Sequence, residues 1–296
     1  MARPWMMALV QAAPASGADP VADLDAELAV LLAEHPDVQM VVYPEIHLYG
    51  DSDAFEDPTD WFAGVAEPLD GPRVRALAQL AAKHHVWLLP GSVAERGEDG
   101  RIFNTAVVFD PAGELVSSYR KIFPWRPYET WACGSEFVVF DIPDVGRFGL
   151  SICYDSWFPE STRQLGWLGA EVVLNIVKTV GPDRVQELVI AQANAIVNQV
   201  YFLSLNVAGP IGWGHSIYVD PDGTVLEHVD QSDPALTLLE LDLDQVTHIR
   251  TQGTAGLNRL WEQLREDDDA VALPAYDGAM TPGRWNPARR HQPPER

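Results

Sequence analysis

The hydrophobic pattern of the chain alternates between short apolar runs and longer stretches with helical spacing. Helical spacing predicts helices over residues 22–33, 73–83, 159–167 and 184–198. Apolar runs predict strands, in chain order, over residues 5–14, 38–43, 86–89, 103–109, 114–119, 148–152, 171–176, 201–207, 216–220 and 236–241. Several of these runs contain no polar alternation, which is typical of a sheet covered on both faces. The pattern therefore predicts a layered α/β fold.

The C-terminal segment differs in composition from the rest of the chain. No linker divides residues 1–260, so we expect one domain there. Residues 261–296 are charged and then rich in Pro and Gly. Two interpretations stay open for this segment: a disordered tail, or an arm that packs on a neighbouring subunit.

Composition and charge exclude several classes of protein. The chain has 47% apolar and 21% charged residues, as globular proteins do. Its net charge of −23 disfavours nucleic acid and anionic membrane surfaces as partners. The acidic excess is interpreted as a solvated coat, and a salty habitat stays open as an alternative.

Cysteine content and apolar runs bear on the expected compartment. Cys133 and Cys153 are too few for a disulfide framework and lack metal-ligand spacing, which favours a reducing cytoplasm. The run Trp5–Val10 fits a short secretory signal or a strand, and its length of about six residues favours the strand. No apolar run approaches the ~20 residues of a membrane span.

Three segments place a reactive side chain directly after an apolar run: Glu45, Lys121 and Cys153. Each alone has an ordinary explanation, as a buried core thiol or a solvated charge. Together they supply a base, a cation and a nucleophile for acyl transfer to a thiol. Glu45 is suited to accept the thiol proton, while Lys121 and the backbone N–H of Tyr154 are suited to stabilise an oxyanion.

These segments resemble the Glu, Lys and Cys motifs of the nitrilase superfamily, the carbon–nitrogen hydrolases. The resemblance extends through connecting motifs in family order, at residues 66–72, 103–106, 169–171, 214–216 and 220–223. It implies a four-layer αββα sandwich of the nitrilase type. It also implies homodimers that pack sandwich on sandwich, or higher homo-oligomers, and no metal or organic cofactor.

Within this superfamily, the segment from Lys121 to Glu129 is similar to that of aliphatic amidases and formamidases. The similarity implies that Glu129 is a second catalytic glutamate, which orients the substrate amide near Lys121. The sequence Cys153-Tyr154-Asp155 fits amidases, whereas nitrilases usually read Cys-Trp-Glu. Relatives that act on carboxylate-bearing amides tend to carry Arg at the position of Trp157. We therefore expect an uncharged substrate, with Tyr154, Trp157 or Trp131 contributing to its binding.

The expected function is hydrolysis of a small, uncharged carboxamide to an acid and ammonia through a cysteine thioester. Two alternatives stay open: a nitrilase that uses the same residues, and a catalytically silent member that acts as an interaction protein. Class I glutamine amidotransferases are disfavoured because Cys153 lacks flanking glycines, and serine amidases because no Gly/Ser-rich stretch exists. The histidines, including His84, His85 and His215, are expected to be structural and not metal ligands.

Overall fold

The computed structural model describes residues 3–50, 58–273, 278 and 280. By compactness the chain divides into two units, Met1–Arg259 and Leu260–Arg296. The described part of the second unit has one short 3-10 helix, Leu260–Glu262. The first unit contains both sheets and the longer helices described below.

The first unit is built on two sheets. One sheet has the order β13 (Ala235–Asp242), β1 (Pro4–Gln11), β2 (Met40–Val42), β3 (Trp87–Leu89), β5 (Ile102–Phe109) and β4 (Ser92–Arg96), and β6 (Leu115–Arg120) also pairs with β5. The other has the order β12 (Val225–His228), β11 (Ile217–Val219), β10 (Tyr201–Asn206), β9 (Val172–Val177), β8 (Gly146–Ile152) and β7 (Val139–Ile142). The central pairs β1–β2–β3 and β8–β9–β10 are parallel, and the outer pairs are antiparallel.

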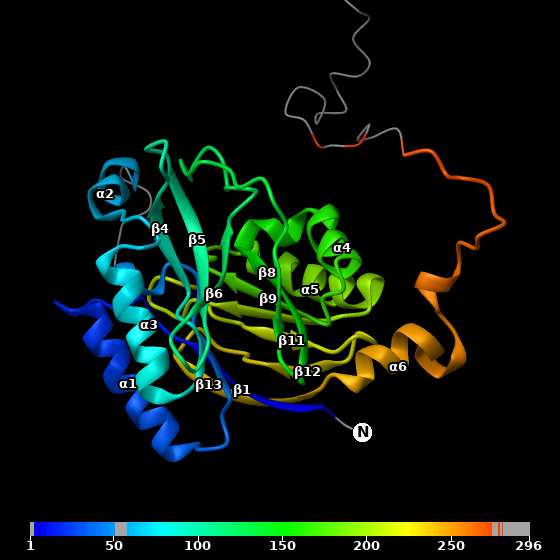
Figure 1. The fold of residues 1–296 in the computed structure, drawn as a ribbon, viewed down its shortest axis with the longest axis horizontal. Coiled ribbons are helices and arrows are strands. Elements are labelled where there is room, and N and C mark those ends of the chain that lie inside the picture. Colours follow the sequence, from blue (N-terminus) through cyan, green and yellow to red (C-terminus); the bar gives the residue numbers. More distant parts are fainter. Residues whose placement is uncertain (1–2, 51–57, 274–277, 279, 281–296) are drawn as a thin grey trace, which may run out of the picture. The chain divides into compact units, whose positions relative to one another are not determined.

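Helices cover the outer faces of both sheets (Figure 1). α1 (Pro20–Glu34) and α3 (Pro72–His84) pack on the first sheet, and α4 (Pro159–Trp167) and α5 (Arg184–Asn198) pack on the second. Two further helices are α2 (Pro58–Val65) and α6 (Asp244–Gln252). α1 begins where the side chain of Asp19 accepts from two backbone N–H groups, followed by Pro20 at the first helical position.

Three apolar clusters define the layers. The first joins the facing sides of the two sheets, for example Met7 with Leu150 and Leu205. The second lies between the first sheet and α1 and α3, and the third between the second sheet and α4 and α5. Neighbouring β1 residues Met7 and Ala8 belong to different clusters because side chains alternate across a strand. This four-layer αββα sandwich confirms the predicted fold class.

The elements that the sequence pattern missed are short or lie at edges: α2, β4, β7, β12 and α6. β12 is an edge strand with three exposed residues, so its hydrophobic signal is weak. The predicted strand at 5–14 ends earlier, at Gln11, whose side chain donates to the carbonyls of Gln231 and Asp233. Within the described ranges, no helix has the length and apolar character needed to cross a bilayer.

Candidate active site

The candidate catalytic residues follow strands of both sheets. Glu45 follows β2, Lys121 follows β6 directly, and Cys153 follows β8 directly. Glu45 and Cys153 lie beyond the carboxyl ends of parallel strands, where α/β folds place their reactive groups, whereas the strand before Lys121 is antiparallel. All three side chains are buried, Lys121 completely.

Lys121 links two glutamates. Its Nζ lies 2.9 Å from Oε1 of Glu45 and 2.8 Å from Oε1 of Glu129. Glu45 also accepts from Nδ2 of Asn104 at 2.7 Å and from the backbone N–H of Lys178 at 2.9 Å. The structure thus brings Glu45, Lys121 and Glu129 together in one hydrogen-bonded group with fixed carboxylate positions.

Glu129 is held from the loop that follows Lys121. Its Oε2 accepts from the backbone N–H of Trp125 at 2.8 Å, while Oε1 faces Lys121. The Glu129 side chain is 21% exposed, against 2% for Glu45. Of the two glutamates, Glu129 is therefore the more accessible to a ligand.

Cys153 begins the 3-10 helix η2 (Cys153–Trp157) with a positive φ of 49°. Few residues other than glycine adopt this left-handed conformation, and such strain is often found at functional sites. Asp155 fixes the turn by accepting from the backbone N–H groups of Ile152 and Phe123, both at 2.9 Å. The hydroxyl of Tyr119 donates to the same carboxylate at 2.7 Å.

Burial and charge shift the pKa values of this group. Burial raises the pKa of Glu45, and Lys121 offsets this only in part. Burial opposes the charge on Lys121, but Glu129 and Glu45 hold its pKa well above the usual value. Burial, followed by the negative charge of Glu45, raises the pKa of Cys153 well above its usual value. The resting thiol is therefore protonated at neutral pH, beside a carboxylate with raised basicity.

A second hydrogen-bonded group, which the sequence analysis did not single out, lies beside the thiol. Oγ1 of Thr179 is 3.8 Å from Sγ of Cys153 and donates to Glu187 at 2.9 Å. Arg184, completely buried, donates to Glu187 at 2.9 Å. Arg184 and Glu187 stand three residues apart at the start of α5, and this i,i+3 spacing of opposite charges was the available signal in the sequence.

The three predicted substrate-binding residues lie in different places. Tyr154 and Trp157 belong to η2, with ring centroids 5.8 Å apart, and Nε1 of Trp157 donates to Glu187 at 3.3 Å. Trp131 instead packs against Phe62 of α2, with centroids 4.3 Å apart, in the cluster beneath α1 and α3. The structure therefore places Tyr154 and Trp157 on the 3-10 helix that begins with Cys153, whereas Trp131 packs against Phe62 and lines a separate cavity of about 310 Å³.

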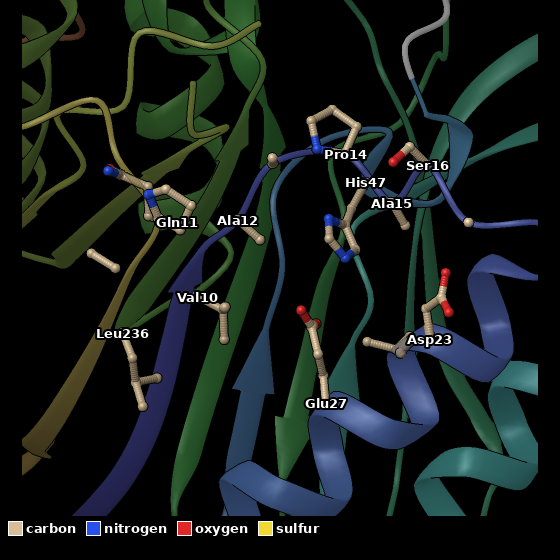
Figure 2. Close-up of a pocket in the computed structure, with 15 residues that line it drawn as sticks. Val10, Gln11, Ala12, Pro14, Ala15, Ser16, Asp23, Glu27, His47 and Leu236 are labelled. Carbon is tan, nitrogen blue, oxygen red and sulfur yellow. The ribbon is translucent and has the colours of Figure 1, made fainter. Parts of the chain in front are cut away.

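A separate cavity of about 530 Å³ opens beside α1 (Figure 2). Glu27 and His47 face the same space in Figure 2. Burial lowers the pKa of His47 to about 4, so its ring is neutral at pH 7. The four candidate catalytic residues do not line this cavity, so it is distinct from the site around Cys153.

Comparisons with known proteins show similarity over most of the chain. The family model for carbon-nitrogen hydrolases matches residues 6–251. A formamidase of Pseudomonas syringae pv. syringae is 30% identical over 221 residues, which are 73% of this chain and 63% of the relative. The chain thus matches less than two thirds of that relative's length.

Solved structures show the same architecture. Nit3 of Saccharomyces cerevisiae, a member of branch 10 of the nitrilase superfamily, matches with a TM-score of 0.74 at 26% identity, covering 84% of this chain and 94% of Nit3. A mutant of the amidase from Nesterenkonia sp. AN1 in complex with butyramide matches with a TM-score of 0.69 at 25% identity, covering 83% and 94%. On this evidence the chain belongs to the carbon–nitrogen hydrolase family of the nitrilase superfamily.

Proposed function

We propose that this protein is an amidase that hydrolyses a small, uncharged carboxamide to a carboxylic acid and ammonia. The observation that carries the proposal is the contact of one buried lysine, Lys121, with both Glu45 and Glu129, beside the buried thiol of Cys153. A thiol, a base and a fixed cation are the groups that acyl transfer to sulfur requires.

In the first step, Glu45 takes the proton of Cys153 as Sγ attacks the amide carbon. The ammonium of Lys121 has three N–H donors, and two of them point to Glu45 and Glu129. The third donor and the backbone N–H of Tyr154 are assigned to the oxyanion of the tetrahedral intermediate. Glu129 accepts from the substrate amide and so orients it.

The intermediate then collapses to a thioester. Glu45 returns its proton to the leaving nitrogen, the C–N bond breaks, and ammonia departs. Glu45 next deprotonates a water molecule that attacks the thioester carbon. The acid leaves, and the proton returns to Sγ of Cys153.

The charges around the thiol favour an uncharged substrate. Three carboxylates, those of Glu45, Glu187 and Glu129, raise the pKa of Cys153, whereas Lys121 lowers it. A substrate carboxylate would meet the same negative field. Trp157, which takes the place of an arginine, donates its N–H to Glu187, and the completely buried Arg184 is already paired with the same carboxylate.

Paired substrates test the function and its specificity. Ammonia release is measured for an uncharged aliphatic amide, an ω-carboxylated amide of equal length, and the matching nitrile. We expect the uncharged amide to react fastest. Faster turnover of the carboxylated amide would overturn the specificity, and acid formed faster from the nitrile would favour a nitrilase.

Two cysteine variants complete this test. Cys153→Ala should abolish turnover, while Cys133→Ser, which changes an exposed thiol, should keep it. Ammonia release by Cys153→Ala at the wild-type rate would contradict the assigned nucleophile. Failure of the wild type on every amide and nitrile would support the catalytically silent alternative.

We also propose that the chain forms a homodimer through the outer face of α5. Val185 and Val189, one helical turn apart, are 59% and 65% exposed. Apolar side chains repeated on one helix face are typical of a surface that another protein covers. A second copy of this chain is the proposed occupant.

A further inference from the structure

Two histidines and an aspartate meet at the base of the β11–β12 hairpin. Ile217 of β11 is paired with His228 of β12. His215 precedes Ile217 by two residues and Asp230 follows His228 by two residues, so both lie just beyond the end of the paired strands. The backbone N–H of His215 donates to the carbonyl of Gln231, so the two segments stay adjacent beyond the strands. Antiparallel pairing thus brings His215, His228 and Asp230 to one place.

The potential ligand atoms of the three side chains converge. One ligand atom from each residue lies within 4.8 Å of the others. Nδ1 of His215 is 3.5 Å from Oδ1 of Asp230, and the two imidazole centroids are 5.8 Å apart. Nε2 of His228 is buried and has no hydrogen-bond partner among the described residues. A buried ring nitrogen without a partner is costly unless something binds it.

We propose that His215, His228 and Asp230 form a binding site for a divalent transition-metal ion such as Zn²⁺. Imidazole nitrogens favour Zn²⁺, Co²⁺, Ni²⁺ and Cu²⁺ over Mg²⁺ and Ca²⁺, which prefer oxygen ligands. In a tetrahedral site with bonds of about 2.1 Å, ligand atoms lie about 3.4 Å apart. The separation of His215 and Asp230 is close to this spacing, and the exposed Asp230 side chain has room to adjust. A water molecule would complete the coordination.

The site is connected to the thiol through a chain of contacts. The carbonyl of His215 accepts from Nε and Nη2 of Arg184 at 3.2 and 3.0 Å. Arg184 donates to Glu187, which accepts from the Thr179 hydroxyl, 3.8 Å from Sγ of Cys153. A metal ion at His215 would therefore fix the backbone segment on which Arg184 is anchored, and so stabilise this side of the active site.

Zinc titration of a thiol-free protein tests the site. Zinc also binds cysteine thiolates, so the full-length, untagged chain carries Cys133→Ser and Cys153→Ala. Isothermal titration calorimetry should show one Zn²⁺ bound per chain, with a rise in melting temperature and no comparable effect of Mg²⁺. Adding His215→Ala or His228→Ala should weaken binding at least about tenfold.

The control is His248→Ala, which removes an exposed histidine of α6 and should leave zinc affinity unchanged. Asp230→Asn changes an exposed side chain, so it tests the third ligand if a histidine variant folds poorly. The proposal is overturned if the thiol-free protein binds no zinc, or if His215→Ala, His228→Ala and Asp230→Asn all bind it as tightly as the control. Because these proteins lack Cys153, the outcome does not depend on the proposed amidase activity.

Discussion

Lys121 is a fully buried cation between two carboxylates, Glu45 and Glu129. A buried charge is tolerated only when partners compensate it, and removal of one partner typically costs about 3–5 kcal/mol. Here two carboxylates face one ammonium, so the three side chains together carry one excess negative charge when all are ionised. That excess opposes a second anion on Cys153, in agreement with its raised pKa.

Glu45→Gln separates the two effects of this glutamate on the thiol. Loss of the base should lower amidase activity at least about 100-fold. Loss of the negative charge should lower the pKa of Cys153, because Glu45 raises it. Alkylation of Cys153 by iodoacetamide, followed against pH in a Cys133→Ser background, measures that pKa. An unchanged or higher thiol pKa in Glu45→Gln would contradict the electrostatic account.

The pH profile of kcat/KM for an uncharged amide should report on Glu45. The base must be ionised, and its pKa is raised above the ordinary value of 4.5, so kcat/KM should fall as the pH drops through a value higher than 4.5. Glu129 contributes to this shift. Glu129→Gln should therefore move the acid limb to lower pH, whatever its effect on rate. An acid limb at or below pH 4.5 in the wild type would argue against Glu45 as the base.

At the scale of elements, the turn from β8 into η2 presents the thiol. Cys153 holds a positive φ there, and Asp155 compensates by accepting three hydrogen bonds from Tyr119, Phe123 and Ile152. These donors come from β6, from the loop after Lys121 and from β8. Asp155 therefore ties the lysine segment of one sheet to the cysteine segment of the other.

Variants of Tyr119 and Asp155 should differ in their free energy of unfolding. Tyr119→Phe removes one donor and should cost about 1 kcal/mol of unfolding free energy. Asp155→Asn places an amide donor against backbone N–H groups, which should cost more, about 1–3 kcal/mol. Urea unfolding of both variants measures the difference. Equal stability of Asp155→Asn and the wild type would show that the carboxylate is dispensable for the turn.

At the scale of the whole molecule, the apolar face of α5 bears on assembly. Its exposed valines are on the outer side of the second sheet, where another subunit would add a further layer to the sandwich. The chain carries a net charge of −23, so association needs local apolar contact strong enough to outweigh repulsion between like-charged copies.

Val189→Glu tests the proposed dimer. It places a charge on this exposed apolar face and should convert a dimer to a monomer in analytical ultracentrifugation. Val30→Glu is the matched control, because Val30 is 60% exposed on α1, at the other side of the sandwich. Dissociation by Val30→Glu, or a Val189→Glu protein that stays dimeric, would place the interface elsewhere.

The hydrophobic pattern and the motifs of the chain are enough to predict the layered α/β fold, its longer elements and the family. The period of the apolar residues is local, so helices such as α4 and α5 were predicted with their observed bounds. Motif order likewise identified Glu45, Lys121, Glu129 and Cys153, whose catalytic roles stay predictions. Edge elements such as β12 were not predicted, because their residues are exposed and show no strong hydrophobic pattern.

Which side chains meet depends on how the elements pack and pair in the folded chain. Thr179 and Glu187 come to the thiol because the segment after β9 lies beside the turn after β8, and His215 comes to His228 and Asp230 through the register of the β11–β12 hairpin. Trp131 and Trp157 were both expected to contribute to substrate binding, yet Trp131 packs against Phe62 of α2 and Trp157 lies beside Glu187. Burial decides the protonation of Cys153 as well. Desolvation and neighbouring charges depend on the folded surroundings of a residue, which its position in the chain does not specify.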